Sequence, residues 1–173
     1  MLSSRASIET KLRVANGIVM SKLCYLVQLW GGTDGHVLKS LQVLQNKAAR
    51  IVTGCGWFTP RKQLLKQCRW LSVKQLVYYQ SVVLAHKIAT SGSPAYLASK
   101  MSTDHPRNTR QATTGCIRYG EQFNDNQSFI QKSFCHRATG EYNSIPANIR
   151  LVRNMATFRA KLKKSVETNI PLD

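Results

Sequence analysis

The sequence has few acidic residues, and those few stand apart from one another. Asp and Glu number 8 against 25 Lys and Arg in 173 residues. No D-x-D or D-D pair occurs, whereas a polymerase or nuclease needs at least two carboxylates that converge on divalent metal ions. We therefore expect no catalytic residue, no metal site and no cofactor, and the isolated chain should not be an enzyme.

Other chemical signatures are also missing. The five cysteines are scattered, odd in number and without a C-x-x-C pair, which predicts neither a zinc ribbon nor a complete set of disulfides. No glycine-rich stretch is followed by the Lys-Ser or Lys-Thr of a phosphate-binding loop. No signal peptide is evident, and no apolar run approaches the roughly 20 residues that span a bilayer. We expect an intracellular protein, nuclear or cytoplasmic.

The excess of positive charge indicates the class of partner. The formal net charge is +17, and a surface so positive repels itself unless a partner neutralises it. Nucleic-acid phosphate is the commonest such partner. An acidic protein and an anionic membrane are the alternatives, but each apolar helix stripe has a partner stripe on a neighbouring helix. That pattern favours mutual burial over membrane binding.

Apolar residues recur at steps of three and four, which predicts a mainly α fold with a small helical bundle first. The first helix should run from Ser7 to Trp30, and the second should follow Asp34 and stop near Gly54. The apolar face of the second helix should contain Val37, Leu41, Leu44, Ala48 and Ile51. A short third helix should open at Thr59-Pro60 and end near Cys68, and a capping box at Ser72 and Gln75 should open a fourth that ends by Gly92.

The rest of the chain is expected to be a polar linker and a short helical tail. Residues 102–127 are rich in Ser, Thr, Asn, Asp and Gly, with almost no apolar periodicity. Phe129 to Phe134 could form a short strand or an extended arm. Pro146 should open a turn of helix, and Asn154 should cap a last helix. The predicted division is therefore a basic helical domain (1–101), a linker (102–127) and a C-terminal helical tail (128–173).

Basic residues of the second and third helices are the candidates for a binding site. Three cations on the second helix fall within a stripe about 80° wide, and the third helix carries four more. Cations can bind phosphates while a neighbouring aromatic ring rests against a sugar or base, and Trp57 and Phe58 stand just before the third helix. The predicted nucleic-acid-binding residues are Lys39, Lys47, Arg50, Arg61, Lys62, Lys66 and Arg69.

The alternative is that Trp57 fills the core beneath its loop and these cations only face water. A second basic cluster wraps around the last helix and is expected to have a lesser role. It consists of Arg159, Lys161, Lys163 and Lys164.

Three stretches resemble the region that follows the palm in non-LTR retrotransposon reverse transcriptases, in the same order over nearly the whole chain. They are LCYLVQLWGG (residues 23–32), LQVLQNKAARIV (41–52), and Ser133-Phe134 through YNSIPANIR (142–150) with Phe158. In that family a helix ending in Trp-Gly precedes a helix of the form L-Q-x-x-Q-N-K-A-x-R, and WFTP (57–60) and WLSV (70–73) also fit. This chain departs at Tyr142, where a tryptophan is commoner.

The resemblance implies a thumb-like helical region with a C-terminal extension, which would hold a template–primer duplex against the palm domain of an RNA-directed DNA polymerase. The duplex could be an RNA–DNA hybrid, DNA or RNA. The palm motif with paired aspartates is missing, so we expect a non-catalytic fragment. Its phosphate contacts should not depend on the nucleotide sequence of the duplex. The alternative is a helical protein-interaction module with an acidic partner, and an autonomous enzyme is the least expected.

Overall fold

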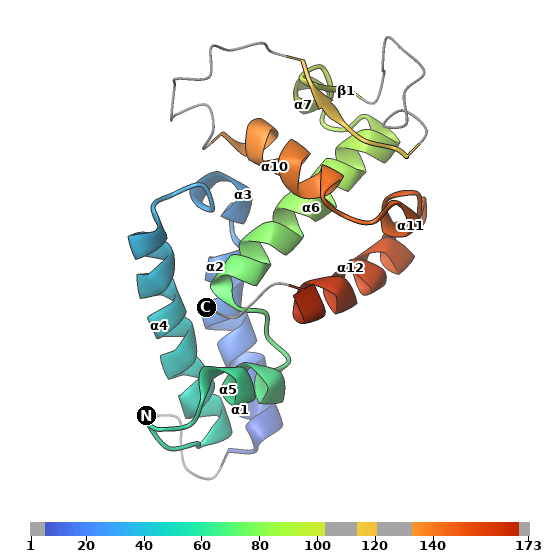
Figure 1. The fold of residues 1–173 in the computed structure, drawn as a ribbon. Coiled ribbons are helices and arrows are strands. Elements are labelled where there is room, and N and C mark those ends of the chain that lie inside the picture. Colours follow the sequence, from blue (N-terminus) through green and yellow to red (C-terminus); the bar gives the residue numbers. More distant parts are fainter. Residues whose placement is uncertain (1–5, 103–113, 121–132, 170–173) are drawn as a thin grey trace.

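The structure, a computed structural model, describes residues 6–102, 114–120 and 133–169, and these are mainly α-helical, as predicted. The central helix is α6 (Val73–Ser91), which crosses the molecule diagonally in Figure 1. It packs against α3 (Val27–Trp30) and α4 (Gly35–Thr53) on the N-terminal side. It also packs against α10 (Phe134–Asn143) and α12 (Met155–Asn169) from the C-terminal part.

The first predicted helix is not continuous. It consists of α1 (Ile8–Ala15), a π-helical segment η1 (Asn16–Met20), α2 (Ser21–Cys24) and α3. The break lies at Leu26, whose φ of 47° is left-handed, a conformation that costs energy for a side chain with a Cβ. Because the break changes the helical phase, Leu26 is exposed although it stands three residues after Leu23 on the apolar stripe that the sequence predicts, and Val27 is buried instead.

Helix α4 ends at Gly54, with a φ of 69°, as predicted. The predicted apolar face of this helix is only partly right, because Leu41 and Ala48 pack against the core but the other three residues are exposed. The fully or nearly buried residues are Gln42, Gln45, Ala49 and Val52. At 3.6 residues per turn their mean direction lies about 100° from the predicted face. The exposed fractions of the predicted face residues Val37, Leu44 and Ile51 are 45%, 55% and 58%.

The predicted ends of the next two helices are confirmed. Helix α5 spans Arg61–Cys68, immediately after Pro60. Helix α6 begins with the predicted capping box, in which the Ser72 hydroxyl accepts from the Gln75 N–H and the Gln75 side chain accepts from the Ser72 N–H. It ends before Gly92, whose φ is 62°.

The segment predicted as a polar linker contains part of a small sheet. After α7 (Ala95–Ala98), strand β1 (Met101–Ser102) pairs antiparallel with β2 (Arg118–Tyr119), so that Met101 lies opposite Tyr119. Strands this short leave no alternating pattern to detect. Residues 103–113 and 121–132 of the predicted linker and arm lie outside the described residues.

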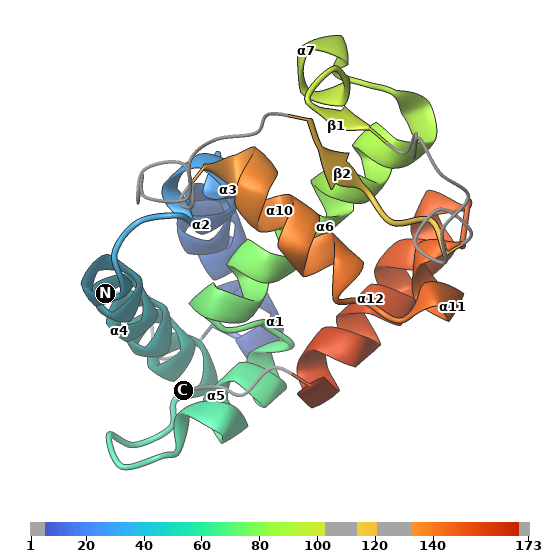
Figure 2. The ribbon, with the colours of Figure 1, turned by 45° about the horizontal axis from the view of Figure 1, so that its top comes forward.

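Helix α10 begins at the end of the segment Phe129 to Phe134 that was considered as a strand or extended arm, and residues 129–132 of that segment lie outside the described residues. Ser133 accepts a hydrogen bond from the His136 N–H and so caps α10, which begins at Phe134. The turn α11 (Ala147–Arg150) after Pro146 and the capping of α12 by Asn154 are confirmed. Figure 2 shows α10 and α12 lying along α6. The C-terminal helices therefore share a core with the N-terminal ones, while the proposed division into three parts stays a prediction.

Two clusters of buried side chains form the core. The larger surrounds α6, where the His86 ring stacks on Phe158 with centroids 3.6 Å apart and contacts the Tyr142 hydroxyl at 3.2 Å. Burial lowers the pKa of His86, which keeps this ring neutral in the core. The smaller cluster joins α1, α4 and α5 through residues such as Leu64 and Val52. No helix among the described residues is both long and apolar enough to cross a membrane.

Candidate nucleic-acid interface

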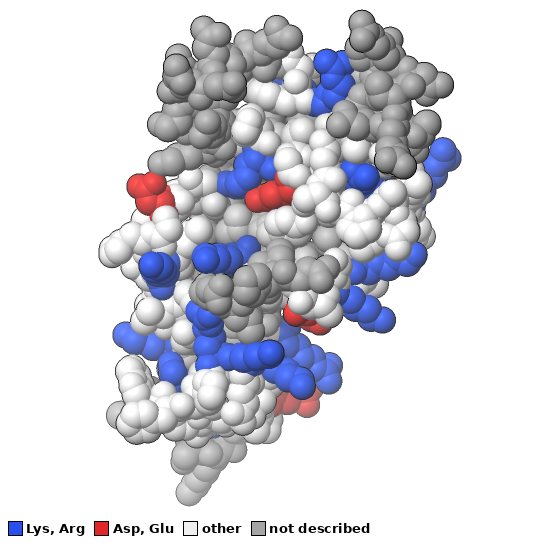
Figure 3. Space-filling model, viewed as in Figure 1, with Lys and Arg blue, Asp and Glu red and all other residues white. Residues whose placement is uncertain are grey.

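Lys and Arg side chains gather over the lower half of the face in Figure 3, where α4, α5, the start of α6 and α12 lie. Two grooves occur in this region, and five of the seven predicted cations line them. The five are Lys39, Arg61, Lys62, Lys66 and Arg69. Among the described residues none of the five has an ion-pair partner.

The first groove, here the α4–α6 groove, has a volume of about 200 Å³. Three helices each contribute one cation to it: Lys39 from α4, Arg61 from α5 and Lys74 from α6. The amides of Gln42 and Asn46 also line it. Cations that converge from three elements give a higher local positive potential for a phosphate backbone than the same charges spread along one exposed helix.

The second groove, here the α5–α12 groove, has a volume of about 460 Å³. Its α5 side carries Lys62 and Lys66, and Arg69 follows directly after that helix. On the opposite side α12 contributes Lys163 and Glu167. The remaining lining residues are Leu65, Trp70 and Gln75.

The other two predicted cations lie outside these grooves. Lys47 is exposed on the side of α4 that faces away from the core. Arg50 is engaged within the chain: its Nη2 donates to the Trp57 carbonyl at 3.1 Å, and its guanidinium lies 5.0 Å from the centre of the Trp57 ring. Arg50 therefore holds the loop between α4 and α5.

The alternative interpretation placed Trp57 in the core beneath its loop, and this is wrong. Its exposed fraction is 69%, and that of Phe58 is 97%. The loop between α4 and α5 thus presents two aromatic side chains to the outside, next to the basic start of α5. Both side chains are accessible to a sugar or base, which is the contact that the sequence predicts for them.

The N–H groups at the start of α6 are partly occupied by the protein itself. The Gln42 side chain accepts from the Val73 N–H at 2.8 Å, and the Ser72 hydroxyl accepts from the Gln75 N–H at 3.3 Å. A helix N-terminus can bind an anion only through N–H groups that are left unsatisfied. Side chains, rather than the α6 terminus, are therefore the main groups that these grooves offer to phosphate.

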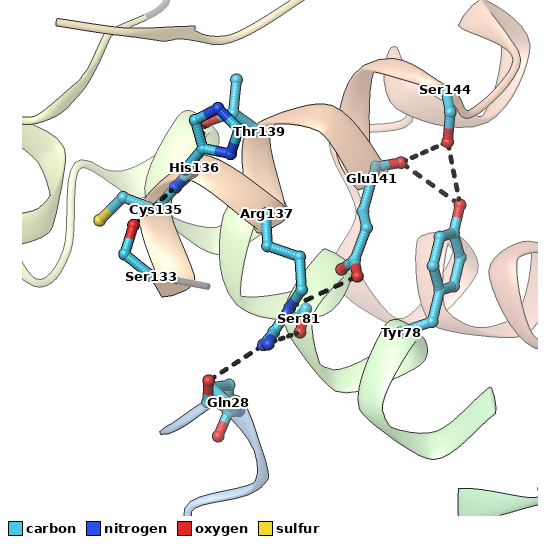
Figure 4. A network of polar contacts seen from close by, with 10 residues as sticks. All are labelled: Gln28, Tyr78, Ser81, Ser133, Cys135, His136, Arg137, Thr139, Glu141 and Ser144. Carbon is cyan, nitrogen blue, oxygen red and sulfur yellow. Dashed lines mark hydrogen bonds and ion pairs between the residues drawn. The ribbon is translucent and has the colours of Figure 1, made fainter. Parts of the chain in front are cut away.

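Among the described residues, the carboxyl group with the clearest pKa shift lies away from both grooves. Figure 4 shows Glu141 and Arg137 on α10. The Arg137 Nε lies 3.5 Å from a Glu141 carboxylate oxygen, and its Nη2 donates to the Gln28 carbonyl and the Ser81 hydroxyl at 3.1 and 3.4 Å. Burial raises the pKa of Glu141 to about 7, although Arg137 opposes the shift. This network joins α3, α6 and α10. Within the described residues, no group of three His, Cys, Asp or Glu side chains could hold a metal ion.

Two groove residues were missed or ranked low from the sequence. Lys74 stands among the apolar residues that open α6, where a single cation carries no pattern. Lys163 belongs to the cluster that wraps around the last helix, and only the packing of α12 reveals that it lines the α5–α12 groove.

Comparison with known proteins relates the chain to transposon reverse transcriptases. A stretch of 76 residues is 37% identical to the Drosophila melanogaster protein named "Probable RNA-directed DNA polymerase from transposon X-element". The alignment covers 42% of this chain and 8% of that polymerase, so the chain matches only a small part of the whole protein. No protein-family model and no solved structure matches the chain.

Proposed function

We propose that this chain is a non-catalytic, thumb-like piece of a retroelement RNA-directed DNA polymerase that holds the template–primer duplex through sequence-independent phosphate contacts. The observation that carries the proposal is the convergence of Lys39, Arg61 and Lys74, and of Lys62, Lys66 and Arg69, on two neighbouring grooves. Without ion-pair partners among the described residues, these cations repel one another, and the phosphates of a nucleic acid would relieve that repulsion. The similarity to a transposon polymerase names a compatible parent protein.

Phosphate contacts fix the position of a duplex without reading its sequence. The cations and amides that line the grooves can make such contacts, and no recognition helix is needed for this task. The duplex could be an RNA–DNA hybrid, DNA or RNA, because each presents a phosphate backbone. In this proposal the palm domain of the parent polymerase supplies the metal-binding carboxylates.

The proposal is tested by titrating salt against the affinity for two unrelated duplexes. Four to six phosphate contacts predict a log–log slope of roughly −3.5 to −5.5 on duplex DNA. The double variant Lys39→Gln/Arg61→Gln should flatten that slope by about 1.8 on both duplexes, because two phosphate contacts are lost. Fluorescence anisotropy of labelled duplexes measures each affinity.

The matched control is Lys87→Gln/Arg153→Gln, which removes the same net charge from exposed residues that line neither groove. The slope of this variant should stay close to that of the unaltered chain. If both double variants flatten the slope equally, only net charge matters and the α4–α6 groove is solvated surface. Absence of binding by the unaltered chain would contradict the proposed function as a whole.

One observation favours the protein-interaction alternative, and it is compatible with a palm partner. The exposed stripe of Val37, Leu44 and Ile51 on α4 is apolar and faces away from the core. Exposed apolar stripes commonly mark contacts with another protein surface. Tight binding to one protein together with indifference to every duplex would favour this alternative over phosphate binding.

A further inference from the structure

The last helix, α12, brings one of its cations to the same groove as the cations of α5. Lys163 lies across the α5–α12 groove from Lys62 and Lys66, whereas Lys161 and Lys164 do not line it. At 100° per residue, Lys164 points away from the buried face of α12, and Lys163 lies at the edge of that face. Two neighbouring residues with the same charge thus occupy different environments.

The position of Lys163 is determined by the core. Phe158, Leu162 and Val166 of α12 are buried against α6. Three residues after Lys163, the Val166 carbonyl accepts a hydrogen bond from Gln75 Nε2 at 3.5 Å, at the start of α6. The distance between Lys163 and α5 therefore depends on packed elements and not on a flexible tail.

The charge of this groove suits an anion. Three cations on or next to α5 and one on α12 surround a volume of about 460 Å³, and Glu167 is the one carboxylate among the described residues that line it. Leu65 and Trp70 lie between the charged groups and provide an apolar lining. A phosphate group between the two helices would be within reach of cations from both sides, while Glu167 would repel it.

We propose that the α5–α12 groove binds a backbone phosphate of the nucleic acid jointly through Lys163 and the α5 cations, so that the C-terminal part of the chain belongs to the binding surface. This inference rests on the proposed function. It assigns α12 a direct role in place of the lesser role expected from the sequence. Glu167 limits the affinity of the groove.

The test compares Lys163→Gln with Lys164→Gln in the full chain, by salt titration on duplex DNA. Loss of one phosphate contact in Lys163→Gln should lower the magnitude of the log–log slope by about 0.9. The ratio of the affinity of the unaltered chain to that of Lys163→Gln should therefore shrink about 3.5-fold from 50 to 200 mM salt. Lys164→Gln should leave the slope within about 0.3 of the unaltered chain. Glu167→Gln should tighten binding roughly twofold at low salt.

A double-mutant cycle tests whether both helices hold one phosphate. If Lys66 and Lys163 share one phosphate, the fold-loss of duplex affinity in Lys66→Gln/Lys163→Gln should be smaller than the product of the fold-losses in the two single variants. Equal effects of Lys163→Gln and Lys164→Gln, with binding by the unaltered chain intact, would overturn this inference alone. If the unaltered chain binds no duplex at any salt concentration, the proposed function fails, and this inference fails with it.

Discussion

Two buried glutamines connect α4 to the start of α6 and offer a direct test of the fold. Gln45 is fully buried, and its Nε2 donates to the Leu71 carbonyl at 2.8 Å. Its Oε1 accepts from Gln42 Nε2 at 2.8 Å, and Gln42 Oε1 accepts from the Val73 N–H at 2.8 Å. These bonds satisfy backbone groups that lie just before and within the first turn of α6.

Replacing Gln45 by Met keeps the side chain of similar size but removes both of its hydrogen-bonding groups. The buried Leu71 carbonyl then loses its amide donor, at a cost of about 1–3 kcal/mol. Gln42 loses one bond worth about 1 kcal/mol but keeps its contact with Asn46 at 2.9 Å. Burial of the apolar methionine offsets about 1 kcal/mol. We therefore expect the free energy of unfolding to fall by about 2 kcal/mol.

Urea unfolding followed by far-ultraviolet circular dichroism measures this change, with an unaltered m-value if only the native contacts change. The control is Gln63→Met on α5, because Gln63 is exposed and its replacement should shift the free energy by less than about 0.5 kcal/mol. A Gln45→Met chain as stable as the unaltered one would refute the reasoning, since the buried amide would then contribute no net stability.

Two further substitutions test other parts of the fold. Gly31→Ala should lower the free energy of unfolding by about 1–3 kcal/mol in the same urea assay. A Cβ at this position would lie 2.5 Å from Val77 Cγ1 and 2.6 Å from the Val27 carbonyl oxygen. Gly17→Ala is the control and should not destabilise the chain, because a Cβ there would meet nothing within 4 Å. Glu141→Gln should remove a pH dependence of the free energy of unfolding. Between pH 4.5 and about 7 the unfolded state has released the Glu141 proton and the folded state retains it, so the unaltered chain loses stability as pH rises. Measured by urea unfolding at each pH, the free energy of unfolding of the unaltered chain should fall by about 3 kcal/mol relative to that of Glu141→Gln and then level off above about pH 7. A difference between the two free energies that stays constant across this range would show that the pKa of Glu141 is not raised.

Helix ends could be predicted from the sequence, but the orientation of α4 could not. Caps such as Gly54 and the Ser72 box act through local backbone geometry, so a few adjacent residues determine them. The buried face of α4 depends instead on partners far along the chain, because Gln45 becomes tolerable in the core only when the Leu71 carbonyl accepts its N–H. Hydrophobic periodicity assigns a glutamine to the surface and cannot detect that partner.

The candidate site was predictable to the extent that its cations are close in sequence. Lys62, Lys66 and Arg69 belong to one short segment, two on α5 and one directly after it, and all three line one groove. The contributions of Lys74 and Lys163 require the packing of α6 and α12, which the sequence pattern does not contain. The engagement of Arg50 with Trp57 likewise depends on the path of a loop.

The start of α6 links the fold to the proposed binding surface, because consecutive residues there line both grooves. Val73 and Lys74 line the α4–α6 groove, and Gln75 lines the α5–α12 groove. Gln42 fixes the first of these residues through the Val73 N–H, and Gln75 in turn contacts the Val166 carbonyl of α12. A change in the position of this turn would therefore move the cations of α4, α5 and α12 relative to one another. Hence the buried glutamines of α4, although they line the core, should affect duplex affinity as well as stability, whereas exposed cations such as Lys87 should affect neither strongly.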